Sequence, residues 1–279
     1  MARGLNTVML AGTIVQDPEL RYTQNGLAIL ELNLAGNDHV IGEDGESRHL
    51  AWYHRATLFG AYAEIMVNQV AAGVPVLVEG RLNYSSWESP EGQRRSSINV
   101  NANRVEVLGF GARRGEATVI DAKGQPRLVD ALNQVMLIGN LTRDAELRYT
   151  PSGTGVTRYS IAVNERYKDR TGQQQESTHF VDVTAWRDLA EACAELKKGD
   201  PVFVTGRLVN DSWTDKEGNK RFSTRIEASR VDFMTRGTGA RAGGNGTPKA
   251  AASKGAQPAG ARPRLDIDEE FPPEDDLPF

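Results

Sequence analysis

The chain has 279 residues, and its 33 lysines and arginines nearly balance 37 aspartates and glutamates, for a formal net charge of −4. This length suits two domains of about 110 residues, each able to bury a core without disulfides or metals. The one cysteine excludes an intrachain disulfide, no cysteine or histidine cluster has metal-site spacing, and we expect no cofactor. No segment resembles a signal peptide or approaches roughly 18 apolar residues, so we expect a cytoplasmic protein without a membrane contact.

The sequence repeats itself when it is shifted by 127 residues. NTVMLAGTIVQDPELRYTQNG, residues 6–26, aligns with NQVMLIGNLTRDAELRYTPSG, residues 133–153, and 12 of the 21 positions are identical. Later stretches of the two copies align in nearly the same register. This duplication predicts a first domain over residues 1–111 and a second domain over residues 131–235.

The first copy consists mostly of short alternating stretches bounded by turn residues. Residues 61–73, AYAEIMVNQVAAG, instead show helical spacing of apolar positions and a closing glycine. Alternation in the strand before this helix directs one set of side chains inward and the other outward. The inward set is His54, Ala56 and Leu58, and the outward set is Tyr53, Arg55, Thr57 and Phe59. We therefore interpret His54 as a structural or interface group rather than a catalytic base.

The strand after the helix alternates in the same way. Its inward set is Val76, Val78, Gly80 and Leu82, and its outward set is Leu77, Glu79, Arg81, Asn83, Ser85 and Trp87. Residues 112–130 then connect the copies. They could be a loose linker, but two short apolar patches flank DAKGQ, and we interpret them as a β-hairpin. Such a connector would fix the two domains relative to each other or contribute to a dimer interface.

The second copy repeats these features. Its helical segment, residues 188–199, has an aspartate in its first turn and two lysines in its last. In FVDVTAW the small apolar residues Val181, Val183 and Ala185 share one face, and the other face has Phe180, Asp182, Thr184 and Trp186. Any one of these rings could belong to a core. Several rings interleaved with arginine and threonine on one sheet face indicate instead a platform on which nucleic-acid bases stack.

Each copy thus contains three strands, a helix and two further strands. This order suits a small barrel in which the helix connects the third and fourth strands. The sequence therefore predicts an all-β fold with one short helix per domain: two tandem five-stranded Greek-key barrels of the oligonucleotide/oligosaccharide-binding (OB) fold, followed by a disordered C-terminal tail.

The tail, residues 236–279, has a segregated composition. Residues 236–264 are rich in Gly, Ala, Pro and Ser and have six basic residues and no acidic one, whereas residues 265–279 have seven acidic residues and no basic one. Such a segment cannot bury enough apolar surface to fold. We interpret its acidic tip as a site for partner proteins, with the last residue as an apolar peg. The tip consists of Glu274, Asp275, Asp276, Leu277, Pro278 and Phe279.

The repeated stretches, GRLNYSSW and the terminal DDLPF together resemble the bacterial single-stranded DNA-binding protein family, in its two-domain Deinococcus-Thermus branch. The resemblance covers about residues 3–110 and 130–235 and the last few residues. It implies a non-enzymatic protein that coats single-stranded DNA during replication, recombination and repair of DNA damage, at the nucleoid. It also implies a homodimer with four OB domains, and recruitment of replication, recombination and repair proteins through the tail.

The resemblance assigns base stacking to Tyr53, Phe59 and Trp87 in the first copy and to Tyr167, Phe180, Trp186 and Trp213 in the second. We expect phosphate contacts from Arg21, Arg55, Arg148, Lys168, Arg170, Arg207, Lys220 and Arg221. The first copy departs from the family at Val40, where an aromatic is usual. Residues 1–111 have 8 basic and 12 acidic residues, whereas residues 128–235 have 15 and 16. We therefore expect stronger DNA binding by the second copy, and a larger loss of binding from Trp213→Ala than from Trp87→Ala.

Two other functions are compatible with this sequence. An OB barrel could bind RNA, because stacking tolerates both nucleic acids, and salt-dependent affinities for DNA and RNA oligomers would discriminate between them. A nuclease or hydrolase could use acids such as Asp182 or Asp211. These acids do not recur in the first copy, where Arg55 and Ser85 occupy the aligned positions.

Overall fold

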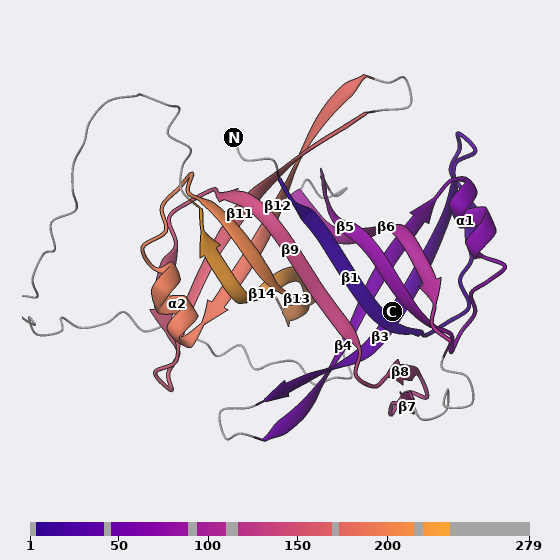
Figure 1. Cartoon of the computed structure of the whole chain (residues 1–279), viewed down its shortest axis with the longest axis horizontal. Helices are drawn as coiled ribbons and strands as arrows, with labels where there is room; N and C mark the ends of the chain where they lie inside the picture. Colours follow the sequence, from indigo (N-terminus) through magenta and orange to yellow (C-terminus); the bar gives the residue numbers. More distant parts are fainter. Residues whose placement is uncertain are drawn as a thin grey trace, which may run out of the picture.

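The computed structural model describes residues 4–41, 46–88, 94–109, 117–168, 173–214 and 220–234 (Figure 1). The first copy contains β1 (Asn6–Ile14), β2 (Leu20–Tyr22), β3 (Ala28–Ile41), β4 (Ser47–Phe59), α1 (Ala61–Met66), β5 (Pro75–Glu88) and β6 (Arg94–Val107). The connector contains β7 (Thr118–Ile120) and β8 (Pro126–Leu128). The second copy contains β9 (Leu132–Leu141), β10 (Glu146–Tyr149), β11 (Gly155–Lys168), β12 (Gln174–Trp186), α2 (Arg187–Cys193), β13 (Pro201–Thr214) and β14 (Lys220–Phe233).

Five long strands close into a barrel in each copy. The first barrel runs β1–β5–β6–β4–β3 and returns to β1, and the second runs β9–β13–β14–β12–β11 and returns to β9. Each barrel has one parallel pair, β4 with β6 and β12 with β14, and its other pairs are antiparallel. The predicted pair of five-stranded barrels is confirmed, with the helix between the third and fourth barrel strands. The short strands β2 and β10, which pair with β3 and β11, were not predicted.

The helices are shorter than the sequence indicates, and the prediction of helices over residues 61–73 and 188–199 is wrong in extent. α1 has 6 residues and α2 has 7. Beyond α1 the backbone N–H of Ala72 donates a hydrogen bond to the side chain of Asp17, at 2.8 Å, and the second copy repeats this bond. Val70 is still buried, although it lies beyond the end of α1. The apolar positions that have helical spacing are therefore buried here by turns and not by further helix. Neither described helix has the length or the apolar character to cross a membrane.

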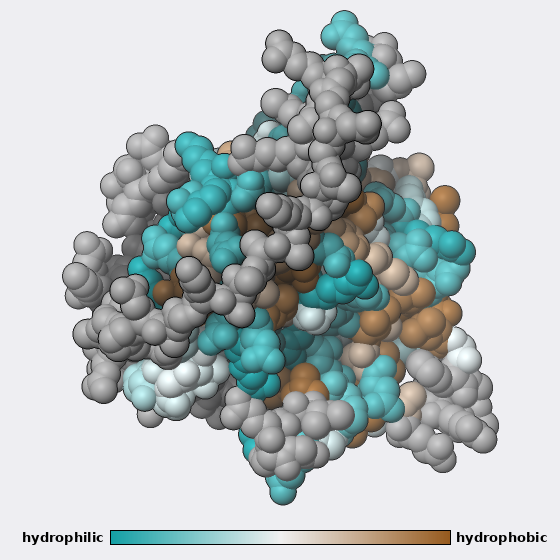
Figure 2. All heavy atoms as spheres, turned by 60° about the vertical axis from the view of Figure 1, so that its left-hand side comes forward, coloured by the Kyte–Doolittle hydropathy of each residue, from teal (hydrophilic) through white to brown (hydrophobic). Residues whose placement is uncertain are grey.

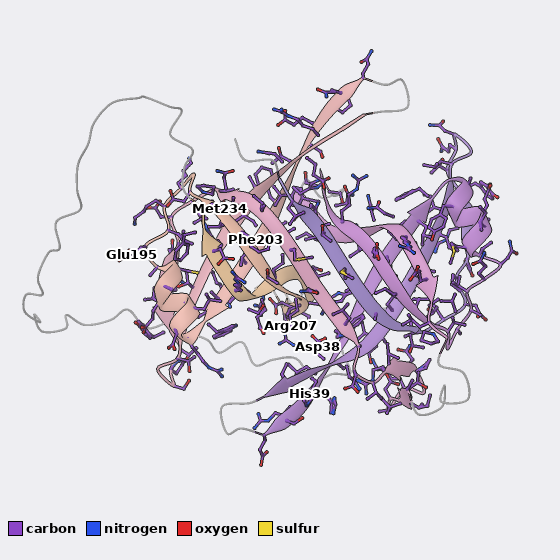
Figure 3. The ribbon with its side chains drawn as sticks, in the orientation of Figure 1. Asp38, His39, Glu195, Phe203, Arg207 and Met234 are labelled. Carbon is purple, nitrogen blue, oxygen red and sulfur yellow. The ribbon has the colours of Figure 1, made fainter. Side chains whose placement is uncertain are left out.

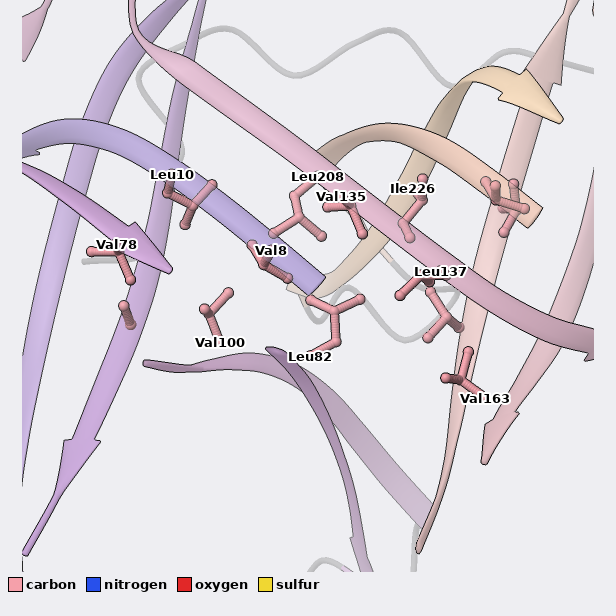
Figure 4. Close-up of a cluster of buried hydrophobic side chains, with 14 of the residues drawn as sticks. Val8, Leu10, Val78, Leu82, Val100, Val135, Leu137, Val163, Leu208 and Ile226 are labelled. Carbon is pink, nitrogen blue, oxygen red and sulfur yellow. The ribbon is translucent and has the colours of Figure 1, made fainter. Parts of the chain in front are cut away.

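One large hydrophobic cluster extends through both barrels. β9 alternates at every residue between buried and partly buried side chains, as period-two alternation requires. Figure 4 shows Val8 of the first barrel in the same cluster as Val135 and Leu137 of the second. The inward sets read from the sequence are buried here, so the alternation correctly identified the core.

β1 and β9 join the two barrels. They pair in antiparallel register from Asn6↔Leu137 to Ala11↔Leu132, side by side at the centre of Figure 1. This pairing makes a continuous array of six strands in the order β6–β5–β1–β9–β13–β14. The two domains therefore share backbone hydrogen bonds as well as a core.

An asparagine near the start of β1 and of β9 uses its side chain to bond both backbone groups of one residue on the neighbouring strand. The Asn6 side chain donates to the carbonyl of Leu82 and accepts from its N–H, both at 2.8 Å. Asn133 makes the same two bonds to Leu208, both at 2.9 Å. A β-bulge at Gly80, repeated in β13, lies close to this bond pair, and a Cβ at Gly80 would collide with a carbonyl of β6.

The connector strands β7 and β8 pair with each other as an antiparallel hairpin. β8 also pairs in parallel with β3, at Gly36↔Leu128. A Cβ at Gly36 would collide with the ring of Trp52 on β4 and with Ala131, which follows the hairpin, so the packing of these two residues on β3 requires glycine. The hairpin is therefore packed against the first barrel.

Candidate nucleic-acid interface

The outer face of β3 and β4 carries the candidate residues of the first copy. Cross-strand pairing places Arg21, Ile29 and Phe59 in one row across β2, β3 and β4, because directly paired residues point to the same side of a sheet. The Phe59 side chain is 42% exposed. Along the same face of β4, Thr57, Arg55 and Tyr53 follow one another in successive rows. Arg55 donates a hydrogen bond to Asn33, its partner on β3, at 3.2 Å. An exposed ring beside arginines is what base stacking with phosphate contact requires.

One carboxylate lies close to both arginines on this face. Glu31 Oε2 lies 3.5 Å from Arg21 Nη2 and 3.9 Å from Arg55 Nη1. The arginine side chains are 66% and 46% exposed, so each ion pair contributes less than about 1 kcal/mol. A phosphate can therefore compete with Glu31 for both guanidinium groups.

The second copy repeats the row of arginine and aromatic. Arg148, Val156 and Trp186 are paired across β10, β11 and β12. Trp186 is partly buried at the N-cap of α2, and Phe180, in the same outward set of β12, is 46% exposed. The second barrel therefore presents two aromatic side chains on this face.

The charges on the second face are rearranged. Arg158, exposed on β11, occupies the position that Glu31 has in the first copy, and Asp182 occupies that of Arg55. Ser160 donates a hydrogen bond to Asp182. Arg158 pairs directly with Thr184 and so shares the face with Phe180. The sequence reasoning missed Arg158, although alternation along β11 would have placed it outward.

Tyr53 belongs to the outward set but is covered by the connector. Its side chain is 7% exposed, and its hydroxyl donates to Asp121 Oδ2 at 2.8 Å. Burial alone would raise the pKa of Asp121, but hydrogen bonds from the backbone of Gln125, from Tyr53 and from the backbone of Lys123 lower it below its ordinary value. Phe180, the equivalent residue of the second copy, is 46% exposed. Stacking on Tyr53 would require the connector to move away.

Arg207 lies between the two barrels (Figure 3). Its Nη1 is 3.2 Å from Asp38 Oδ2 of β3, and its Nη2 is 2.7 Å from Glu227 Oε1 of β14. Burial raises the pKa of Asp38 above its ordinary value, although Arg207 opposes this rise. The repeat-related pair, Arg81 and Glu165, is 3.7 Å apart. Two carboxylates thus already engage the charge of Arg207, which the sequence analysis assigned to phosphate.

Two buried histidines also lie between the barrels. His54 is 5% exposed, and its Nε2 donates to the carbonyl of Leu208 at 3.2 Å, as expected for an interface group. Burial lowers the pKa of His54 to about 4, against the opposing effect of this bond. His179 is also 5% exposed, and its Nδ1 accepts a hydrogen bond from the backbone N–H of Tyr84 at 3.0 Å. Each histidine therefore makes a hydrogen bond to the backbone of the other barrel.

Both barrels correspond to one family model. The model of the Single-strand binding protein family matches residues 5–108 and, a second time, residues 132–234. The chain belongs to the single-strand binding protein family. The expected resemblance to its two-domain Deinococcus-Thermus branch is confirmed by full-length relatives from Deinococcus and Thermus.

The single-stranded DNA-binding protein of Deinococcus radiodurans is 50% identical in an alignment 306 positions long, gaps included, and one from Thermus thermophilus is 52% identical in an alignment of 282 positions. Both alignments cover 100% of this chain and of the relative. The crystal structure of the wild-type single-stranded DNA binding protein from Thermus aquaticus has a TM-score of 0.67 and 45% identity, covering 87% of this chain and 98% of that chain. The similarity to these single-strand binding proteins therefore includes both barrels.

Membership of the single-strand binding family argues against an enzyme. These relatives are named for binding and not for a reaction. Arg225 Nη2 lies 3.0 Å from Asp211 Oδ1, so an ion pair already engages this proposed catalytic acid. The chain is thus a member of a non-enzymatic binding family.

Several predicted contacts of this single-strand binding protein lie outside the described structure. Six belong to described strands by their backbone, but their side chains are not described: Trp87, Tyr167, Lys168, Trp213, Lys220 and Arg221. Arg170 and the acidic tip, residues 274–279, lie outside the described residues altogether. These assignments stay predictions.

Proposed function

We propose that this protein binds single-stranded DNA without strong sequence preference, by stacking bases on aromatic rings and contacting phosphates with arginines. The observation that supports this most directly is the repeated row of one arginine and one ring, Arg21 with Phe59 and Arg148 with Trp186. Every base has a face that can stack, so such rows tolerate any sequence. The names of the relatives support the same ligand. Occupied strands are thereby protected.

Titration of the intrinsic fluorescence of the four tryptophans tests this function. Trp52 is 6% exposed and supplies a constant background, so quenching reports on Trp87, Trp186 and Trp213. We expect quenching by a single-stranded oligomer that persists at raised salt, and little quenching by a duplex of the same sequence. Absence of quenching by single strands at low salt would contradict the proposal.

RNA is the alternative ligand. Stacking alone does not distinguish the two nucleic acids, because the 2′-hydroxyl is the group that a protein must read. The same titration with RNA and DNA oligomers of equal sequence is expected to favour DNA. Equal or tighter binding of RNA at both salt concentrations would support the alternative.

We also propose that the protein is a homodimer, joined through the outer face of the six-stranded array. Apolar side chains on this face are neither buried nor fully exposed: Met9, Ala11, Leu77, Leu132, Met136, Ile138 and Phe203. Apolar residues are visible among hydrophilic ones on the molecular surface (Figure 2). Apolar side chains grouped on one face of a sheet are typical of an interaction surface. Light scattering is expected to give twice the chain mass for the wild type and one chain mass for Met136→Glu; a wild-type monomer would contradict the dimer.

We further propose that the acidic tip recruits replication, recombination and repair proteins to DNA at the nucleoid, in the cytoplasm. The support is compositional: an apolar peg, Phe279, follows acids that would steer it to basic patches. The same acids resemble phosphates and would compete with DNA. Deleting residues 272–279 is expected to preserve or tighten DNA binding and to abolish capture of partners, with the full chain as the control. Loss of DNA binding on deletion would contradict this.

A further inference from the structure

The two barrels meet in an aromatic pair at one of their junctions. Tyr84 on β5 of the first barrel packs edge-to-face against Phe180 on β12 of the second, with ring centroids 5.7 Å apart and an interplanar angle of 81°. Tyr84 lies beyond the last pairing of β5 with β1, on the part of β5 that pairs with β6 alone. Phe180 is 46% exposed and Tyr84 is partly exposed. A ring from each barrel is therefore accessible at one place.

Polar bonds hold this pair in position. The backbone N–H of Tyr84 donates to His179 Nδ1 at 3.0 Å, so the residue next to Phe180 anchors the strand that carries Tyr84. His179 Nε2 lies 3.3 Å from Glu165, which is also 3.7 Å from Arg81 on β5. The junction is thus fixed from both sides, and its rings are preorganised for a ligand rather than brought together by it.

The repeat-related junction has a different character. Tyr53 occupies the position of Phe180, and Asn210 occupies that of Tyr84. The side chain of Asn210 donates to the backbone carbonyl of Tyr53 at 2.6 Å, and the Tyr53 hydroxyl bonds Asp121 of the connector. Tyr53 is 7% exposed. One junction therefore presents two rings, whereas the other is polar and covered by the connector.

We propose that a bound single strand passes from the first barrel to the second across the Tyr84–Phe180 junction, and that Tyr84 is a base-contacting residue. This inference rests on the proposed function. A strand that continues from one face to the other must cross a gap between barrels, and exposed rings at the crossing allow its bases to stay stacked. The covered junction offers no such surface, so the path crosses between the barrels at one place.

Binding of oligomers of two lengths tests the crossing. A strand of about 8 nucleotides fits one barrel, and one of about 32 nucleotides spans two. Tyr84→Ala is expected to weaken binding of the long strand about tenfold and of the short strand less than twofold. Tyr84→Phe keeps the ring and is expected to bind both like the wild type. The matched control is Tyr22→Ala, since Tyr22 is an exposed tyrosine on β2 of the same barrel, hydrogen bonded to α1.

The outcomes separate the crossing from the function. If the wild type binds neither strand, the proposed function fails. If the wild type binds both and Tyr84→Ala affects neither, or affects both equally, the crossing is overturned while the function stands. Should Tyr84→Ala unfold, photocrosslinking of the wild type with 5-iododeoxyuridine at the middle of the long strand carries the test. Adducts at Tyr84 support the crossing, and adducts only elsewhere, Phe180 included, overturn it.

Discussion

Arg207 of the second barrel lies 3.2 Å from Asp38 of the first, and its repeat-related counterpart Arg81 faces Glu165 across the same interface. The two ion pairs run in opposite directions, since each barrel contributes one arginine and one carboxylate. The internal repeat is therefore also an approximate two-fold symmetry of the interface between the barrels. This symmetry allows each half of the interface to serve as a control for the other.

Removing Arg207 is expected to cost more stability than neutralising Asp38. Arg207→Ala leaves two partly buried carboxylates, Asp38 and Glu227, without their counter-charge, and we expect the free energy of unfolding to fall by about 1–3 kcal/mol. Because burial raises the pKa of Asp38, its ionised form is disfavoured, and Asp38→Asn is expected to change the same quantity by less than about 1 kcal/mol. Urea unfolding measures both, with Arg158→Ala as an exposed control. Equal losses from the two variants would contradict this reasoning.

The protonation of His54 is expected to lower the stability of the fold as the pH falls. Its pKa is lowered to about 4 in the folded protein, from an ordinary value of 6.5, so the unfolded chain binds the proton first. The contribution of this group is complete above about pH 6.5 and is lost as the pH falls towards 4, by up to about 3 kcal/mol. His54→Val, which introduces the residue found at the equivalent position 181, should flatten unfolding free energy between pH 6.5 and 4. An unchanged slope in this variant would refute the assignment.

Asn133 is expected to be a stability determinant of the joined sheet. Asn133→Ala leaves the buried N–H of Leu208 without its partner, while the carbonyl keeps the bond from His54. We expect a loss of about 1–3 kcal/mol in the free energy of unfolding. Asn140→Ala removes an exposed side-chain bond on the same strand and is the control, expected to cost less than about 1 kcal/mol. Similar losses from both would show that the paired bonds to Leu208 matter little.

The equivalent residues Phe180 and Tyr53 are expected to respond in opposite ways. Phe180→Ala removes an exposed ring and should weaken single-strand binding by about 1–3 kcal/mol with little change in stability. Tyr53→Ala removes a buried ring and should lower the free energy of unfolding by about 3–5 kcal/mol while changing affinity less than twofold. Fluorescence titration and urea unfolding of both variants measure these quantities. A comparable loss of affinity in the Tyr53 variant would restore it to the DNA interface.

Local patterns in the sequence were sufficient for the barrels and for most of the outward faces. The repeat set the number of domains, and alternation placed Val181 and Val183 in the core and Phe180 outside it, as observed. The helical spacing of apolar residues overestimated the length of α1. Residues such as Val70 are buried as that spacing predicts, but they lie in turns beyond the helix. A pattern of burial does not by itself distinguish a helix from a turn that packs on the same surface.

Contacts between the copies could not be read from local patterns. β1 and β9 are far apart in the sequence, and the residues of either strand do not indicate which strand it pairs with. The burial of Tyr53 likewise depends on Asp121 of the connector, and the engagement of Arg207 depends on Asp38. Each of these residues has the outward position that alternation predicts, and a distant segment then covers or neutralises it.

The antiparallel pairing of β1 with β9 also bears on how the two halves of this chain can evolve. Two separate copies of one barrel that met through β1 would make every contact twice, so each substitution would change both symmetry-related contacts. Within one chain, a histidine at position 54 can face the other barrel while position 181 is valine, and Tyr84 can lie at one junction while Asn210 lies at the other. Covalent linkage thus frees each side of the interface to mutate alone, so that one polypeptide can assign unequal tasks to halves of common origin.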